Sequence, residues 1–231
     1  MNRGFIVTFE GGEGTGKSTQ IELLKSRLKK EGLNVSHLNF YEPGSTPVGD
    51  LCRIIVKNCI DKTHLVDFKN VHKYIEKQEL SSFSQACLFL TSRSEIYDKL
   101  IRPEYEAGKI ILFDRSIDST TVYQGYAQQP KLINWIRESN KYILSGLNID
   151  ITYLLDLDVT ITQERMNKRD GELSDRFQDK DIDFHNRVRM GYLEEASYFK
   201  ERIHIIDGDD SILKINNKIY SKFKEMYEQL F

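Results

Sequence analysis

The segment that most restricts the fold of this chain lies between residues 5 and 30. It begins with an apolar, β-branched run, FIVTFE, which is typical of a buried strand. A glycine-rich loop follows, and then KSTQIELLKSRLKK places Ile21, Leu24 and Leu28 at helical spacing. Residues 11 to 18 match G-x-x-x-x-G-K-[ST] in the strand–loop–helix setting that this pattern requires. The sequence therefore predicts a phosphate-binding loop for a nucleoside triphosphate, and a chance glycine-rich turn is the weaker alternative.

The residues of this loop have separate tasks in the predicted site. Glycines let backbone N–H groups turn toward phosphate oxygens, and the helix that begins near Lys17 adds the positive end of its dipole. We expect Lys17 to reach the β- and γ-phosphates and the hydroxyl of Ser18 to ligate Mg²⁺. The predicted nucleotide-binding residues are Gly11, Gly12, Glu13, Gly14, Thr15, Gly16, Lys17, Ser18 and Thr19.

The composition describes a soluble globular protein of 231 residues, with 39% hydrophobic residues, 29% charged residues and a formal net charge of -2. This balance gives no basic field that would attract nucleic acid or an anionic membrane. No apolar run approaches the ~18–20 residues that span a bilayer, and no cleavable signal precedes the first strand. Cys52, Cys59 and Cys87 lack C-x-x-C spacing, which favours free thiols in a reducing compartment. We therefore expect a cytoplasmic protein without nucleic-acid or membrane partners.

Strand-like and helical segments alternate along the rest of the chain. After FIVTFE, strands are predicted at 33–40, 109–114, 151–157 and 204–208. Helices are predicted up to about residue 58, from residue 79 to Pro103, and after the last strand. The alternation predicts a single α/β domain over residues 1–231, with a parallel sheet of about five strands flanked by helices on both faces. Residues 60–78 are polar and weakly periodic, and we expect an insertion there.

Residues 167 to 170 spell N-K-x-D, the pattern with which GTPase switch proteins read guanine. In those proteins the pattern directly follows a core strand, whereas here it lies late in a helical stretch beyond residues 151–157. The chain also lacks a D-x-x-G segment after a strand that would sense the γ-phosphate. We therefore interpret the tetrapeptide as a coincidence inside a basic segment.

The strand predicted at 109–114 ends in Asp114, and Arg115 follows it directly. An Asp at the carboxyl end of a strand next to the phosphate loop is where such folds hold Mg²⁺, usually through water. Asp114 is thus a predicted metal ligand together with Ser18. Arg115 would then point a bidentate phosphate ligand into the same crevice. A surface ion pair at the end of the strand is the alternative interpretation.

Five segments, in this order, give the chain a resemblance to a known family: FEGGEGTGKSTQ, YEPGSTPVGDLCR, ACLFLTSR, FDRSIDSTTVYQG and RMNKRDGELSDRF. Together they resemble bacterial thymidylate kinases of the type that carries its arginines in a lid. The resemblance covers most of the chain except about 60–78. It implies a P-loop nucleoside monophosphate kinase fold, ATP-dependent phosphorylation of dTMP to dTDP, ATP and Mg²⁺ as cofactors, and a homodimer. A kinase of the same fold for dUMP or dGMP, and a regulatory P-loop ATPase, stay as alternatives.

The resemblance also implies an acceptor site for dTMP. Phe89 and Arg93 are four residues apart on one predicted helix, so a ring that can stack on a base lies beside a guanidinium that can bond its edge. Core packing is the alternative for Phe89, and we do not expect Arg93 to be fully buried, because burying an unpaired charge is costly. By resemblance, Phe89 stacks on thymine, Arg93 reaches its O4, and Arg115 binds the α-phosphate. The other implied acceptor residues are Glu42 in the E-P-G turn, Thr120 and Gln124 at the base edge near N3, Tyr123 under the sugar, and Glu13 at the 3′-OH.

A basic segment at about residues 165–178 is predicted to supply further catalytic charge. Phosphoryl transfer depends on neutralising charge on the moving group, and the phosphate loop contains no Arg. In the resembled family this Arg lies either in the loop or in a lid, so the lid is expected to provide it here. Which of its arginines touches the γ-phosphate stays open, and a solvated helix face is the alternative for the segment. The predicted catalytic residues are Lys17, Arg115, Arg165, Arg169 and Arg176.

Overall fold

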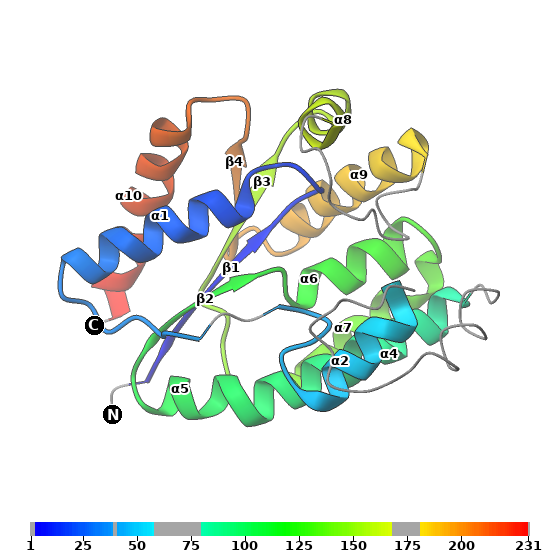
Figure 1. Ribbon diagram of the computed structural model, residues 1–231, viewed down its shortest axis with the longest axis horizontal. Helices are drawn as coiled ribbons and strands as arrows, with labels where there is room; N and C mark the ends of the chain where they lie inside the picture. Colours follow the sequence, from blue (N-terminus) through cyan, green and yellow to red (C-terminus); the bar gives the residue numbers. More distant parts are fainter. Residues whose placement is uncertain (1–2, 39–40, 58–79, 168–180, 231) are drawn as a thin grey trace.

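The structure, a computed structural model, describes residues 3–38, 41–57, 80–167 and 181–230 (Figure 1). Its strands are β1 (Phe5–Glu10), β2 (Ile110–Asp114), β3 (Ile151–Asp156) and β4 (Ile203–Asp207). Its α-helices are α1 (Lys17–Lys30), α2 (Pro47–Lys57), α4 (Ser82–Ile96), α5 (Arg102–Glu106), α6 (Ile117–Thr120), α7 (Ile133–Leu144), α8 (Val159–Asn167), α9 (Ile182–Tyr198) and α10 (Ile212–Leu230). Shorter elements are the π-helical turns η1 (Tyr97–Ile101) and η2 (Thr121–Tyr126) and the 3₁₀ turn η3 (Pro130–Leu132). Within those ranges, no helix combines the length and the apolar character that a membrane crossing requires.

The strands of the described sheet all run parallel, in the order β2-β1-β3-β4. The register places Val7 of β1 opposite Leu112 of β2 on one side and Ile151 of β3 on the other. The α/β prediction with a parallel sheet is therefore confirmed. The strands predicted at 109–114, 151–157 and 204–208 match β2, β3 and β4 to within one residue at each end.

The strand predicted at 33–40 is wrong, because Val35 forms only an isolated parallel bridge with Ile110. The N–H of Ser36 still donates to the carbonyl oxygen of Ile110 at 2.8 Å. The N–H of Leu38, however, donates to Oγ of Ser36 at 3.2 Å, a local bond that competes with a sheet ladder. Leu38 is also exposed, so burial does not hold the segment against the sheet. The predicted sheet of about five strands thus has four in the described part of the chain.

Helices cover both faces of this sheet, as Figure 1 shows. Successive side chains of a strand point to opposite faces, so the odd-numbered residues of β1 pack with α1 and α10, and Ile6 packs with α4, η1 and α5. On the first face, Leu24 and Leu28 of α1 are fully buried. Burial of each such side chain contributes about 1.5–3 kcal/mol. This packing fixes α1 against β1, and it thereby fixes the loop that joins them.

The carboxyl ends of the parallel strands meet at one edge of the sheet, where ligands bind in open α/β folds. The loop from Gly11 to Gly16 follows β1 at this edge, Arg115 follows β2, and Gly208 follows β4. The predicted insertion at 60–78 and most of the predicted lid, with Arg169 and Arg176, lie outside the described residues. The assignment of the whole chain to one domain stays a prediction.

Candidate functional site

The glycine loop has the backbone geometry that the motif predicts. Gly11 has a φ of 134°, and a Cβ there would lie 2.5 Å from the carbonyl oxygen of Leu155 in β3. A side chain at this position would therefore be excluded by both conformation and space. Gly16, with a φ of 94°, precedes the first turn of α1. The loop thus turns tightly against β3 and directs the N-terminus of α1 toward the edge of the sheet.

Lys17 is folded into this loop. Its Nζ donates to the carbonyl oxygens of Gly11 at 3.2 Å and Gly12 at 2.7 Å. Burial, followed by repulsion from Arg115, lowers the pKa of Lys17 to about 8, although the surrounding carboxylates oppose this shift. The ammonium group therefore lies at the place where the motif predicts phosphate oxygens. Its charged form is disfavoured in this structure, and a bound anion would stabilise it.

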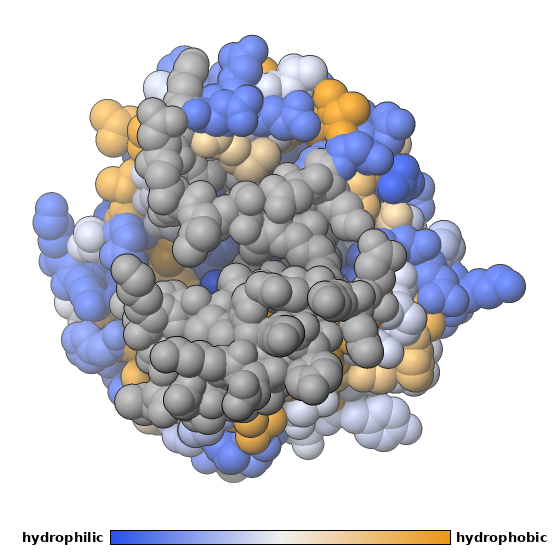
Figure 2. Space-filling model, turned by 45° about the vertical axis from the view of Figure 1, so that its right-hand side comes forward, coloured by the Kyte–Doolittle hydropathy of each residue, from blue (hydrophilic) through white to orange (hydrophobic). Residues whose placement is uncertain are grey.

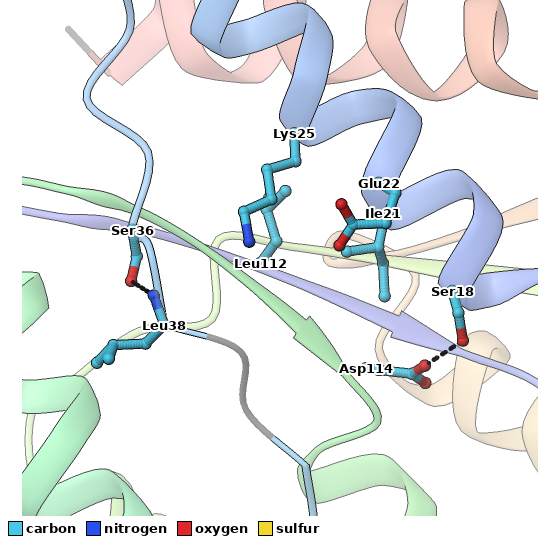
Figure 3. Close-up of a pocket in the computed structure, with 8 residues that line it drawn as sticks. All are labelled: Ser18, Ile21, Glu22, Lys25, Ser36, Leu38, Leu112 and Asp114. Carbon is cyan, nitrogen blue, oxygen red and sulfur yellow. Dashed lines mark hydrogen bonds between the residues drawn. The ribbon is translucent and has the colours of Figure 1, made fainter.

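Ser18 and Asp114 face each other across the gap between α1 and β2, with Oγ of Ser18 donating to Oδ2 of Asp114 at 2.8 Å (Figure 3). Their oxygens border a hollow of about 140 Å³. Among the described residues there is no group of three or more His, Cys, Asp or Glu side chains that could hold a metal. Mg²⁺ in nucleotide sites takes one or two protein oxygens and completes its shell with water and phosphates, so these two residues fit such an ion.

Arg115 has a left-handed backbone, with a φ of 65°, which is uncommon for a residue other than glycine. Its backbone N–H donates to the carbonyl oxygen of Phe9 at 2.9 Å, which ties the residue to the end of β1. Its guanidinium donates to the carbonyl oxygen of Gly11 and to Oε1 of Glu13, both at 2.9 Å. Burial opposes the charge of Arg115, but Glu13 and other negative groups raise its pKa well above the usual value. The phosphate loop and the residue after β2 are thus joined by an ion pair.

Arg93 lies at the centre of a buried polar cluster. Its side chain is 0% exposed, and the paired carboxylate of Glu42 is 3% exposed. Nε of Arg93 donates to Oε2 of Glu42 at 3.1 Å, and Nη2 donates to the other oxygen. Further acceptors are Oδ1 of Asn140 at 2.8 Å, Oγ1 of Thr120 at 2.7 Å and the carbonyl oxygen of Ser116 at 3.0 Å. The expectation that Arg93 is not fully buried is therefore wrong, because these acceptors offset the cost of removing its charge from water.

The other predicted acceptor residues lie on α4 and η2. Phe89 is partly buried against the core cluster that also contains Tyr123. Tyr123 is 7% exposed, and Arg115 lies over its ring at 5.3 Å. Gln124 is 1% exposed and donates from Nε2 to Oε1 of Gln85 at 3.3 Å, while its own buried Oε1 has no hydrogen-bond partner in the described part of the chain. A buried carbonyl oxygen of this kind can accept a bond from a ligand.

One groove of about 720 Å³ joins these groups at the edge of the sheet. Its lining contains the residues from Glu13 to Thr19 of the phosphate loop and α1, together with Glu42, Asp114, Arg115 and Arg165. Phe89, Arg93, Thr120, Tyr123 and Gln124 are not among its lining residues. Figure 2 brings the right-hand side of Figure 1 forward, and the described residues visible there are mainly hydrophilic, with hydrophobic ones in separate groups.

The sequence reasoning missed several lining residues: Gln20, Tyr41, Gly208, Asp210, Ile212 and Ile215. Nη2 of Arg165 lies 3.4 Å from the carbonyl oxygen of Gly208, which brings α8 next to the connection between β4 and α10. A signal for Gly208 and Asp210 existed, since Gly208 ends a predicted strand, Asp210 lies two residues beyond it, and the carboxyl ends of the strands meet at this edge. For Tyr41 the signal was its place directly before Glu42 in the E-P-G turn.

Comparison with known proteins identifies the family of the chain. A model of the thymidylate kinase family matches residues 9–219. The thymidylate kinase of Maridesulfovibrio salexigens is 36% identical over 227 residues, which cover 95% of each chain. That of Halothermothrix orenii is 35% identical over 223 residues, covering 96% of this chain and 97% of its own. That of Caldanaerobacter subterraneus subsp. tengcongensis is 33% identical over 223 residues, 96% of each chain. The chain therefore belongs to the thymidylate kinase family.

Proposed function

We propose that this protein transfers the γ-phosphoryl group of ATP to dTMP and releases dTDP and ADP. The observation that carries the proposal is the single groove that runs from the phosphate loop to Glu42 and Arg115. A phosphoryl donor held by the loop and a phosphate acceptor held by Arg115 would meet inside it. An ATPase without an acceptor would have no use for the second half of this groove.

The chemistry that we assign to these residues is alignment and charge neutralisation. An oxygen of the dTMP phosphate bonds to the γ-phosphorus while the bond from that phosphorus to the β–γ bridging oxygen breaks. No general base is needed, because the acceptor phosphate is already ionised. Lys17 is already inside the loop, 2.7 Å from the carbonyl oxygen of Gly12, and can exchange this contact for phosphate oxygens. Arg115 is assigned to the acceptor phosphate and Glu13 to the 3′-OH of the sugar.

Mg²⁺ is the metal that we assign to Ser18 and Asp114. When bound to phosphate oxygens it neutralises negative charge on the transferring group. The protein contributes a hydroxyl and a carboxylate that are already 2.8 Å apart. These hard oxygen donors are those that Mg²⁺ prefers.

The base pocket that we propose lies behind Glu42 and Arg115. Among the described residues, the contacts of Arg93 engage Nε, one Nη1 hydrogen and both Nη2 hydrogens, which leaves one Nη1 hydrogen for the O4 of thymine. The buried Oε1 of Gln124 can accept the N3–H of the base, with Thr120 beside it and Phe89 stacking on the ring. Guanine presents a different edge pattern, which favours dTMP over dGMP.

An ADP-release assay across a panel of monophosphates tests the proposal. dTMP should raise turnover above the ATP-only rate, with weaker stimulation by dUMP and dGMP. Arg115→Ala should raise the KM for dTMP, whereas Arg165→Ala should mainly lower kcat, as we expect for a catalytic cation. Turnover that does not respond to dTMP would contradict the assignment and favour the ATPase alternative.

We also propose a cytoplasmic homodimer, for which exposed apolar side chains on α2 and α4 are the structural support. Val48 and Leu51 of α2 are 38% and 40% exposed, and Phe83 of α4 is 48% exposed against Trp135 of α7. Such groups favour contact with another protein surface. Light scattering after size-exclusion chromatography should give twice the chain mass, and a monomer at micromolar concentration would contradict this proposal.

A further inference from the structure

Glu10, the last residue of β1, is a buried acid to which the proposed chemistry gives no task. It is 1% exposed and forms no ion pair with any described Lys or Arg. Its carboxylate instead accepts from neutral donors: the backbone N–H of Ser116 at 2.7 Å, Oγ of Ser119 at 2.6 Å and the hydroxyl of Tyr192 at 3.0 Å. An ionised group that bonds directly to no cation is costly in such a place, so its retention there needs a reason.

The donors to Glu10 are the groups that surround Arg115. Ser116 is the next residue in the chain, and its N–H anchors the loop that gives Arg115 its left-handed backbone. The hydroxyls of Ser119 and Tyr192 lie 3.4 and 3.0 Å from Nη1 of Arg115. Those two hydroxyls are also 2.8 Å from each other. Glu10 and Arg115 therefore both contact the same pair of hydroxyl oxygens.

This arrangement fixes the direction of the hydroxyl protons. A hydroxyl has one hydrogen to donate and two lone pairs with which to accept. A guanidinium only donates and a carboxylate only accepts, so at least one hydroxyl proton turns toward Glu10 and lone pairs face Arg115, while the other proton can lie between the two hydroxyls. If Glu10 were neutral, one of its oxygens would itself carry a proton, and a hydroxyl could turn its own proton toward the guanidinium.

We propose that the ionised carboxylate of Glu10 is a positioning residue for phosphoryl transfer, acting through Ser119 and Tyr192 to hold the guanidinium of Arg115 toward the acceptor phosphate. The inference rests on the proposed function for the identity of that acceptor. It also links helix α9, which carries Tyr192, to the orientation of Arg115.

The titration of Glu10 agrees with this role. Burial first, and then the nearby Asp118, raise the pKa of Glu10 to about 7, against the bonds from Ser119 and Ser116 and the charge of Arg115. The fraction of ionised Glu10 therefore falls as the pH falls from 8 to 6, and the KM for dTMP should rise over this range. The charged and titratable groups around it are Lys17 on α1, Arg115 after β2, Asp118 on α6, Tyr192 on α9 and Arg202 before β4.

The test compares Glu10→Gln with the wild type in steady-state kinetics from pH 6 to 8. Glu10→Gln should raise the KM for dTMP by about tenfold at pH 8, the worth of about one hydrogen bond to a charged group, with little change in the KM for ATP. Protonation of the dTMP phosphate itself raises the KM for dTMP at low pH in both proteins. The readout is therefore the additional rise of this KM in the wild type, which the variant should lack. The proposal would be overturned if Glu10→Gln had the wild-type KM for dTMP, or if it lost as much in kcat as is expected in KM while the KM stayed unchanged.

Two further variants separate positioning from folding. Tyr192→Phe keeps Glu10 but removes the hydroxyl between it and Arg115, and its effect should be less than additive with Glu10→Gln. Asp150→Asn is the matched control: Asp150 is a second buried acid, which accepts from the N–H of Ile6 at 2.8 Å at the other end of β1. Its KM for dTMP should equal that of the wild type.

A measurement without substrate keeps this proposal distinct from the proposed function. The side-chain NMR signal of Arg115 should show slow guanidinium rotation in the wild type and in Asp150→Asn, and faster rotation in Glu10→Gln. Unchanged rotation would overturn the positioning role even if dTMP is the acceptor. Faster rotation in a protein that dTMP does not stimulate would support the role and contradict only the acceptor.

Discussion

Removing the cation of the buried Arg93–Glu42 pair should destabilise the fold strongly. Arg93→Met keeps much of the side-chain volume but leaves the 3%-exposed carboxylate of Glu42 without its partner. Breaking a buried pair in this way costs about 3–5 kcal/mol. For a chain of this length each kcal/mol lowers Tm by about 2–4 °C, so the expected loss is about 6–20 °C. Urea unfolding followed by circular dichroism measures the free energy of unfolding directly.

Two comparisons show whether the unpaired charge causes this loss. Arg102→Met removes the same kind of side chain from a surface pair whose acid, Asp98, is 76% exposed, and it should cost no more than about 1 kcal/mol. The double variant Arg93→Met/Glu42→Leu removes both charges, so it should be more stable than Arg93→Met alone. If Arg93→Met costs less than about 1 kcal/mol, or if the double variant is the least stable of the three, the reasoning is refuted.

The pH dependence of the same variant has a definite sign. Burial raises the pKa of Glu42, while Arg93 opposes this rise, so the loss of Arg93 should raise the pKa further. With a pKa higher in the folded than in the unfolded state, Glu42 takes up its proton preferentially in the folded state. The stability deficit of Arg93→Met relative to the wild type should therefore be smaller at pH 5 than at pH 8. A constant deficit would show that lost packing, and not the unpaired carboxylate, is responsible.

Further predictions concern catalysis by Lys17, discrimination between deoxyribose and ribose, and the stability of the fold at acidic pH. Lys17→Met should lower kcat in the ADP-release assay by about 100-fold or more, with an unchanged circular dichroism spectrum. Tyr123→Ala should reduce the kcat/KM preference for dTMP over its ribonucleotide counterpart by about tenfold, since the bulk expected to exclude a 2′-OH is lost. Burial and then Lys222 lower the pKa of His204. The folded state thus resists protonation, so stability should fall as the pH drops below about 6.5, and His204→Gln should flatten this dependence in urea unfolding.

The phosphate loop could be predicted because its geometry is local. The glycine spacing, the strand before the loop and the helix after it all lie within residues 5–30. The parallel direction of the strands could also be predicted, from their alternation with helices, whereas their order comes only from the structure. The strand at 33–40 failed because Oγ of Ser36 accepts the N–H of Leu38 and because the exposed Leu38 is not held against the sheet by burial.

The acceptor side was harder to predict because its contacts join distant segments. Arg93 and Glu42 are 51 residues apart, and Thr120 and Asn140 come from two further helices. A partial signal was present, since Arg93 lies three residues from both Leu90 and Ile96, which are buried on the same helix. Helical periodicity therefore indicated that Arg93 faces inward, but only the fold could reveal the carboxylate that makes this burial tolerable.

The charges that line the groove give a physical reason to look for further cations beyond its described walls. Its lining contains the cations Lys17, Arg115 and Arg165, and the acids Glu13, Glu42, Asp114 and Asp210. Arg115 already faces Glu13 at 2.9 Å, so little of its charge is in excess. The phosphates of two nucleotides would add several negative charges to this surface. A divalent ion at Asp114 would offset part of these charges, and further cations are needed for the remainder. Replacement of Arg169 or Arg176 is therefore expected to lower kcat and to leave the binding of dTMP in the absence of ATP unchanged.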